Sequence, residues 1–234
     1  MSVTIGNNWV YGIKDIPFNK MYAQFGEEAI FDYIFKHIGT KTKYLVDFGA
    51  GTLNSGLSNS RYLIESGWDG LLMDGNPEEE TEIIKKEFIT AENIVSLFGK
   101  YNVPEEFDLL SIDIDGNDFW VLKEILKSKY SPRVIINEFN GCLQEGVLQV
   151  MKYNPLHSWG ENDYYGASFE AFKTLLNQAG YILVHQTATT NMIFIKSDIV
   201  GEVNLPVTYI RNQYHGHSPN REWVYFNQTD NLLK

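Results

Sequence analysis

The sequence has few of the features that mark secreted, membrane-spanning or disulfide-stabilised proteins. It contains one cysteine, Cys142, in 234 residues. Neither an internal disulfide nor a cysteine-based zinc cluster can form from it, which suits a reducing cytosol. No apolar run is long enough to span a bilayer, and the first residues have neither a basic start nor an apolar core. We therefore expect a cytoplasmic protein without a membrane span.

Basic residues are also scarce. The chain has 19 lysines and arginines against 30 aspartates and glutamates, for a net charge of −11. The basic residues form no run, and affinity for nucleic acids or anionic membranes depends on clustered lysine and arginine. Nucleic acid is therefore not expected as a partner. With 44% hydrophobic residues, the chain has the composition of an ordinary globular protein with one domain.

Helical and strand patterns alternate along the first 140 residues. Apolar periodicity predicts a leading helix at residues 24–37, and short apolar runs between turn signals predict strands. The strands are expected at 44–48, 70–74, 88–91, 107–112 and 133–139, and the helices between them at 58–66, 77–86, 94–101 and 119–129. This alternation predicts a doubly wound, Rossmann-like α/β fold with helices on both faces of a parallel sheet.

The second half departs from this alternation. Residues 140–165 are rich in Gly, Asn, Trp and Tyr and too long for an ordinary connection, so we expect a functional loop over the binding crevice. A helix and two strands in a hairpin follow, at 166–179, 180–185 and 192–196. We therefore predict a mostly parallel seven-stranded sheet with an antiparallel last strand. One domain is expected over residues 1–196, with the aromatic tail 197–234 packed on it.

The first predicted strand ends in a glycine turn. In VDFGAG, Asp47 precedes Gly49, Ala50 and Gly51. Glycine at such a point allows a sharp turn and the close approach of a ligand. Any glycine-rich turn after a strand would show this pattern, and a nicotinamide site competes with it. However, the third glycine of a dinucleotide fingerprint would fall on Asn54, so the dinucleotide pattern fails.

Polar or small residues also follow the next three predicted strands. Asp74 and Gly75 end the second strand, where a carboxylate can accept two hydrogen bonds from a ribose diol. Ala91 and Glu92 follow the third strand, where they can flank an adenine ring, and Asp113 ends the fourth. Because the carboxyl ends of parallel strands meet at one edge of a sheet, these residues predict one ligand crevice. A solvated turn is the alternative for Asp74.

The motifs VDFGAG, LLMDGNPE, ITAENI and FDLLSIDIDG have the order and spacing of the cofactor motifs of class I S-adenosylmethionine-dependent methyltransferases. The sequence most resembles the FkbM-like methyltransferases of glycan and natural-product pathways, from about Tyr22 through Lys196. The resemblance implies S-adenosylmethionine as the cofactor, with Gly49 and Gly51 at its methionine part and Asp74 at its ribose. The resemblance also places Ala91 and Glu92, which follow the third predicted strand, near the adenine. The resemblance alone suggests a sugar as the methyl acceptor.

Acidic residues crowd the loops after the fourth and fifth predicted strands. Asp113, Asp115 and Asp118 lie in the first loop, and Asn137 and Glu138 in the second. The carboxylates of Asp113, Asp115 and Glu138 could share a proton or bind Mg²⁺ or Mn²⁺ through oxygen ligands. Their placement is similar to that in divalent-metal sugar and catechol O-methyltransferases. The alternative is that Asp115 and Asp118 cap the next helix.

Methyl transfer to an alcohol requires alignment and removal of a proton. The candidate catalytic residues are Asp115, Glu138 and His157, since histidine titrates near neutral pH and this one lies in the long loop. A merely exposed histidine is the alternative. Trp159 and Tyr164, with Tyr165, form either a stacking wall for the acceptor or ordinary loop packing.

The function expected from these residues is O-methylation of a small polar acceptor. A non-catalytic cofactor-binding assembly or scaffold protein, and a related metal-dependent hydroxylase, remain alternative hypotheses. The expected partner is a small-molecule acceptor, and association into a homo-oligomer is also compatible with the sequence.

Overall fold

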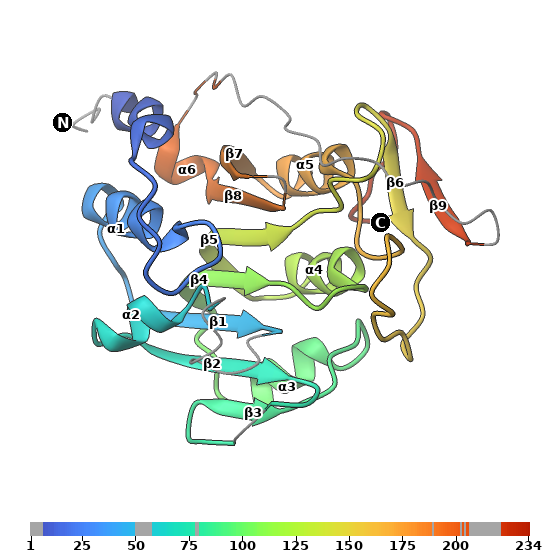
Figure 1. Ribbon diagram of the computed structural model, residues 1–234, viewed down its shortest axis with the longest axis horizontal. Helices are drawn as coiled ribbons and strands as arrows, with labels where there is room; N and C mark the ends of the chain where they lie inside the picture. Colours follow the sequence, from blue (N-terminus) through green and yellow to red (C-terminus); the bar gives the residue numbers. More distant parts are fainter. Residues whose placement is uncertain are drawn as a thin grey trace.

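The computed structural model describes residues 7–49, 58–77, 80–188, 190–201, 203, 205 and 221–234 (Figure 1). In chain order the elements are η1 (Asn7–Asp15), α1 (Glu27–Ile38), β1 (Tyr44–Phe48), α2 (Arg61–Glu65), β2 (Asp69–Asp74), β3 (Ile84–Lys86), α3 (Ile94–Lys100), β4 (Glu106–Ile112), α4 (Asp118–Lys127), β5 (Ser131–Glu138), β6 (Leu148–Met151), α5 (Phe169–Gln178), β7 (Tyr181–Thr187), β8 (Asn191–Lys196), α6 (Ser197–Val200) and β9 (Trp223–Phe226).

Seven strands form one sheet in the order β3-β2-β1-β4-β5-β8-β7. The strands β1 to β5 pair in parallel, and β8 runs antiparallel to both β5 and β7. The predicted doubly wound α/β fold, with a mostly parallel seven-stranded sheet and an antiparallel last strand, is therefore confirmed. β8 is the last strand of this sheet along the chain, but it lies inside the sheet and leaves the edge to β7.

Each face of the sheet packs on its own set of helices, because successive side chains of a strand point to opposite faces. Leu45 of β1 belongs to the core that η1, α1 and α2 cover. Val46 and Phe48 of the same strand belong to the core under α3, α4 and α5. The central strands are buried on both sides, as parallel strands usually are.

The region between β2 and β3 differs from the prediction. No helix forms at residues 77 and 80–86 of the described chain; β3 occupies Ile84–Lys86, and the strand predicted at 88–91 is absent. The Thr81 hydroxyl accepts the Ile84 N–H at 3.0 Å and so closes a tight turn before the strand. Ile84 is buried and pairs with Leu72. Sheet pairing therefore overrides the helical propensity of this charged segment.

The long segment after β5 also contains an element that was not predicted. β6 pairs antiparallel with β9 of the C-terminal segment in a separate two-stranded sheet (Figure 1). Phe226 of β9 lies 6.1 Å from the ring centroid of Phe119 in α4. Leu232 is buried in the same core. The domain boundary at residue 196 stays a prediction, because β9 contacts the preceding domain without defining where it ends.

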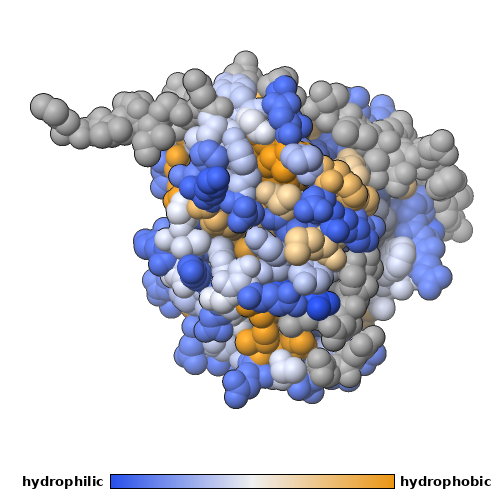
Figure 2. All heavy atoms as spheres, turned by 60° about the vertical axis from the view of Figure 1, so that its left-hand side comes forward, coloured by the Kyte–Doolittle hydropathy of each residue, from blue (hydrophilic) through white to orange (hydrophobic). Residues whose placement is uncertain are grey.

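The surface shown in Figure 2 is mostly hydrophilic, with apolar residues in separate places. Within the described residues, no helix combines the length and the apolar character that crossing a membrane requires.

Candidate functional site

A cavity of about 440 Å³ lies at the carboxyl ends of β1, β2 and β4. This is where the strand order reverses, since the chain leaves β1 toward β2 on one side and returns to β4 on the other. Open α/β sheets bind their ligands at such a point. The described lining residues are Gln24, Asp47, Phe48, Gly49, Ser58, Asn59, Asp74, Gly75, Glu87, Phe88, Ile89, Ser111, Asp113, Ile114, Asp115, Asn117, His157, Ser158 and Trp159.

Acidic side chains dominate the charge of this lining. Five carboxylic acids line the cavity, and no lysine or arginine does so among the described residues; the acids are Asp47, Asp74, Glu87, Asp113 and Asp115. Such a cavity repels phosphate groups and attracts cations.

Gly49 makes the turn from β1 into the cavity wall. Its φ of 70° lies in the left-handed region, and its N–H donates to the Met73 carbonyl oxygen at 3.0 Å. A Cβ at this position would overlap the Asp113 carbonyl oxygen. The chain's own backbone therefore requires glycine here, whether or not a ligand is bound. Ala50 and Gly51, the other two predicted cofactor contacts of this turn, lie outside the described residues.

Asp47 lies beneath this turn and is almost fully buried. Burial raises its pKa to about 6, although hydrogen bonds with Ser60 and Ser111 lower it. The Asp47 carboxyl group therefore has neutral hydroxyl partners and no cationic partner in the described part of the chain.

Of the cofactor contacts predicted after the second and third strands, two line the cavity and two do not. Asp74 and Gly75 line the cavity, and one Asp74 oxygen accepts the Asn76 N–H at 2.6 Å. Ala91 and Glu92 do not line it. Instead, the Ala91 N–H donates to the Tyr153 hydroxyl at 3.2 Å, and that hydroxyl donates to Glu92.

Glu87, Phe88 and Ile89 line the cavity at the position predicted for Ala91 and Glu92. The cause is the earlier position of β3, which ends at Lys86 and shifts its carboxyl end by several residues. Phe88 is 50% exposed, so its ring is accessible from the cavity.

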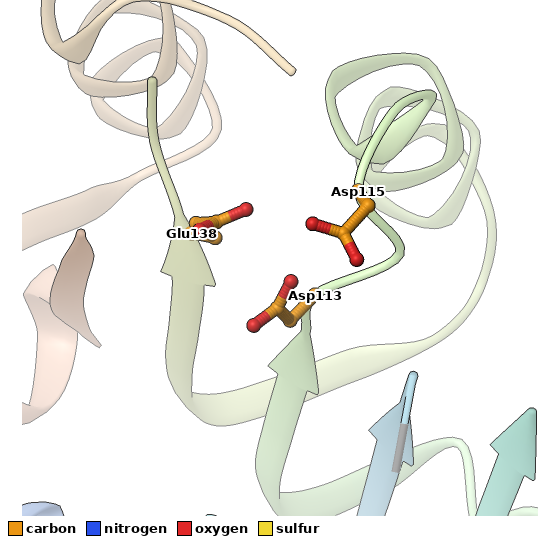
Figure 3. A group of neighbouring side chains, drawn as sticks. All are labelled: Asp113, Asp115 and Glu138. Carbon is orange, nitrogen blue, oxygen red and sulfur yellow. The ribbon is translucent and has the colours of Figure 1, made fainter. Parts of the chain in front are cut away.

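The three predicted metal ligands converge in the structure. Asp113 follows β4, Asp115 lies on the next loop, and Glu138 ends β5, with their carboxylates facing one another (Figure 3). One oxygen from each lies within 4.8 Å of the others. Glu138 does not line the cavity itself, but it reaches the two aspartates that do.

Burial, and next the negative charges of the neighbouring acids, governs the acid–base behaviour of this group. Burial, and then the charges of Asp118 and Asp115, raise the pKa of Asp113 well above its usual value. Burial and the Asp113 charge do the same for the pKa of Glu138. Burial and the Asp118 charge raise the pKa of Asp115 to about 6. Oxygen Oε2 of Glu138 is buried without a hydrogen-bond partner.

The loop that presents Asp115 is held by Asp118. The fully buried Asp118 carboxylate accepts the N–H groups of Ile114 and Gly116, each at 2.8 Å. Asp115 has φ 52°, a conformation that non-glycine residues rarely adopt. The Asp118 side chain therefore binds the loop that leads into α4 and does not cap the helix, as the alternative had it. These hydrogen bonds maintain the strained conformation of Asp115.

His157 reaches the same cavity from the long segment after β5. Its ring lies so close to Gly116 that a Cβ there would overlap Cδ2 of the imidazole. The segment is tied down through Asn154, whose carbonyl oxygen accepts from the Asn117 side chain at 2.7 Å and from the His157 N–H at 2.9 Å. The Nε2 atom of His157 is buried without a hydrogen-bond partner.

The predicted aromatic wall is reduced to one member. Trp159 lines the cavity and is 45% exposed. Its indole N–H donates to the Asn162 carbonyl oxygen at 2.8 Å. The Tyr164 hydroxyl instead donates to the Glu222 carbonyl oxygen at 2.6 Å. Tyr165 does not line the cavity, and burial raises the pKa of its hydroxyl.

Several polar lining residues were not predicted. Ser111 had a visible signal, since it interrupts the apolar run of β4 on the face that Asp47 shares. Ser58 and Asn59 precede α2, and Gln24 precedes α1, where sequence alone does not distinguish a lining residue from a solvated one.

No protein-family model matches the chain, and no curated protein matches it significantly. One similar solved structure is the MycE methyltransferase from the mycinamycin biosynthetic pathway in complex with Mg, SAH and mycinamycin VI. The two chains are 13% identical, with a TM-score of 0.48, and the match covers 84% of this chain and 56% of MycE. The present chain thus spans little more than half the length of that protein.

Proposed function

We propose that this protein is an S-adenosylmethionine-dependent O-methyltransferase that acts on a small polar acceptor, such as a sugar. The observation that most supports this function is the charge of the cavity at the topological switch point. Five carboxylic acids and no described lysine or arginine line it. A phosphate-bearing dinucleotide would be repelled there, whereas S-adenosylmethionine has no phosphate and carries a positively charged sulfonium.

The cofactor contacts in this proposal follow the ends of the strands. Asp74 and Gly75 would bind the ribose, and Asp47 and Gly49 the methionine part, with Asp113 beside Asp47 at the end of the adjoining strand β4. Gly51 keeps its proposed role near the methionine part, and Ala50 remains a proposed cofactor contact.

The adenine would pack on Phe88, whose ring is half exposed in the cavity. Ala91 and Glu92 would act through the Tyr153 hydroxyl that they hold, rather than by touching the adenine.

The acidic group fits a hard divalent cation. Asp113, Asp115 and Glu138 offer three carboxylate oxygens within 4.8 Å of one another, and Oε2 of Glu138 is buried without a partner. Oxygen ligands of this kind suit Mg²⁺ or Mn²⁺. A bound cation would supply Lewis-acid stabilisation of the alkoxide that forms on the acceptor.

The chain's own residues would position the acceptor and manage its proton. Asp115 and His157 face the cavity from two loops that Asn117 ties together. If no cation binds, His157 would take the acceptor proton as general base, with Asp115 and Glu138 as its acidic neighbours.

Two measurements test the proposed function. Calorimetry should show that the purified protein binds S-adenosylhomocysteine, and a screen of sugars and small alcohols should yield a product that has gained one methyl group. Failure to bind would overturn the proposal. Binding without transfer to any acceptor would favour the non-catalytic assembly protein, and an oxidised product would favour the hydroxylase.

A further inference from the structure

The segment before α1 is fixed by buried carboxylates of the first turn of that helix. One Glu28 oxygen accepts the N–H groups of Met21, Tyr22 and Ala23, at 2.7 Å for Tyr22 and 3.4 Å for Ala23. Glu28 is almost fully buried, so water does not compete for these hydrogen bonds. The backbone of this segment therefore has one defined path beside the cavity.

The same segment is also held at both flanks. On one side the Tyr22 hydroxyl donates to Glu65 of α2 at 2.8 Å. On the other side the fully buried Glu27 accepts the Phe25 N–H and the Asn191 side chain, each at 2.8 Å. Asn191 pairs with Glu138 across β8 and β5, so the segment extends from α2 to the strand beside the acidic group.

Gln24 is the residue that this arrangement places in the cavity lining. It is exposed, and its side-chain amide has no hydrogen-bond partner in the described part of the chain. The backbone on either side of it, by contrast, is bound by Glu28 and Glu27. The structure thus holds the Gln24 backbone and leaves its amide open to a ligand.

The chemistry of the cavity indicates what this amide would bind. S-adenosylmethionine ends in an ammonium and a carboxylate, and the Asp47 carboxylate can bind the ammonium. The carboxylate needs a donor, and no described lysine or arginine lines the cavity. Ser58 already accepts from the Arg61 N–H at 3.1 Å and bonds Ser60, and the Asn59 amide donates to Ser111 at 3.4 Å. The Gln24 side-chain amide carries two N–H donors, and neither has such a partner among the described residues.

We propose that Gln24 recognises the amino-acid end of the cofactor and that Glu28 is the positioning residue that holds it in place. This inference rests on the proposed function, since it assumes that S-adenosylmethionine occupies the cavity. Gln24 contacts the ligand, whereas Glu28 acts through the backbone of residues 21–23.

The test compares two ligands that differ only in this end. Calorimetry would measure the affinity of the wild-type protein and of Gln24→Ala for S-adenosylhomocysteine and for methylthioadenosine, which lacks the amino-acid group. A lost hydrogen bond to a charged group should weaken S-adenosylhomocysteine binding roughly tenfold or more and leave methylthioadenosine binding unchanged. Gln144→Ala, at an exposed glutamine outside the lining, is the matched control and should change neither affinity.

Glu28→Gln tests the positioning role. The Glu28→Gln variant should weaken S-adenosylhomocysteine binding as Gln24→Ala does. In the Gln24→Ala background, Glu28→Gln should cause no further loss of affinity. It should still lower Tm in that background, because it removes a buried carboxylate that binds the backbone. Asp108→Asn is the stability control, because Asp108 also binds three consecutive N–H groups but lies far from the lining.

The possible results distinguish a failure of this inference from a failure of the proposed function. Equal loss of both ligands, or no loss of either, in Gln24→Ala would overturn the role of Gln24. Additive losses in the double variant would overturn the role of Glu28. A wild-type protein that binds neither ligand would overturn the proposed function, and this inference with it.

Discussion

Two aspartates five residues apart, at opposite ends of β4, have opposite electrostatic surroundings. Burial alone would raise the pKa of Asp108, but hydrogen bonds from Arg133 and from the N–H groups of residues 41–43 lower it. Arg133 approaches Asp108 at 2.6 Å. At the other end, Asp113 faces Asp115 and Glu138, and its pKa is raised.

The difference shows how the chain treats buried charge. At the amino end of the strand, Asp108 has Arg133 and three N–H groups as partners, so removing either member of the ion pair would leave the other buried without compensation. At the carboxyl end, the carboxylates of Asp113, Asp115 and Glu138 repel one another. This repulsion destabilises the protein when no cation is bound and favours the binding of a cation there. The following predictions test this contrast, from the largest expected effect to the smallest.

Asp108→Asn should destabilise the protein by about 3–5 kcal/mol, because it leaves the Arg133 charge buried without its partner. Urea denaturation measures this loss. The control is Glu106→Gln, which removes an exposed ion pair with Lys41 at the same end of the sheet and should cost less than about 1 kcal/mol. Equal losses in the two variants would refute the assigned role of Asp108.

The stabilisation by Asp108 should also depend on pH. Since its folded-state pKa is lowered, the contribution is present above the unfolded-state pKa and is lost as pH falls through the folded-state value. Wild-type and Asp108→Asn stabilities should therefore converge in strong acid.

Glu138→Gln should weaken the binding of a divalent cation at the acidic group. The wild-type protein should bind Mn²⁺ in calorimetry, and the variant should bind it at least roughly tenfold more weakly. With an acceptor identified, chelation should stop turnover and Mg²⁺ or Mn²⁺ should restore it.

The alternative general base gives the opposite pattern. Chelator would then have no effect, and His157→Ala would reduce kcat roughly a hundredfold or more. Full activity in Asp115→Ala, Glu138→Ala and His157→Ala alike would leave alignment as the sole source of catalysis.

The same Glu138→Gln variant should be more stable than the wild-type protein when no cation is present. Burial raises the pKa values of Asp113 and Glu138 most, and the repulsion between the two carboxyl groups, which this variant relieves, raises them further. The expected gain is on the order of 1 kcal/mol, measured by urea denaturation in chelator. A loss of stability would show that the acidic group is not strained.

The smallest expected effect is a rise in Tm as pH falls from about 7 to 5. The pKa values of Asp47 and Asp115 are raised to about 6. Their folded forms therefore take up protons before the unfolded chain does, and stability increases as pH falls through this range. We expect about 2–4 °C. The rise should shrink in an Asp47→Asn, Asp115→Asn double variant; an unchanged rise would assign it to other groups.

Sequence predicted the parts of the fold that depend on continuous burial. β1 and β4 are apolar runs bounded by turn signals, and both were predicted within one residue of their bounds. Because parallel topology brings their carboxyl ends together, the convergence of Asp113, Asp115 and Glu138 followed without knowledge of the loops.

Sequence failed where local pattern and tertiary pairing disagree. Residues 77–86, PEEETEIIKK, are rich in charged residues as an exposed helix would be, yet Ile84 pairs with Leu72 at the sheet edge. β6 and β9 are four residues each and about seventy residues apart, so neither has a partner in its own neighbourhood. Gln24 has no sequence signal, because its place in the lining depends on carboxylates that bind its backbone.

The pairing of β6 with β9 has a consequence for shortened forms of the chain. A chain ending before Trp223 would leave the hydrogen-bonding edge of β6 uncovered, beside apolar residues that are buried in the intact protein. Uncovered edges of this kind pair with other chains. Truncated forms should therefore aggregate through residues 148–151, and their sedimentation should depend on concentration even if their cavity is intact.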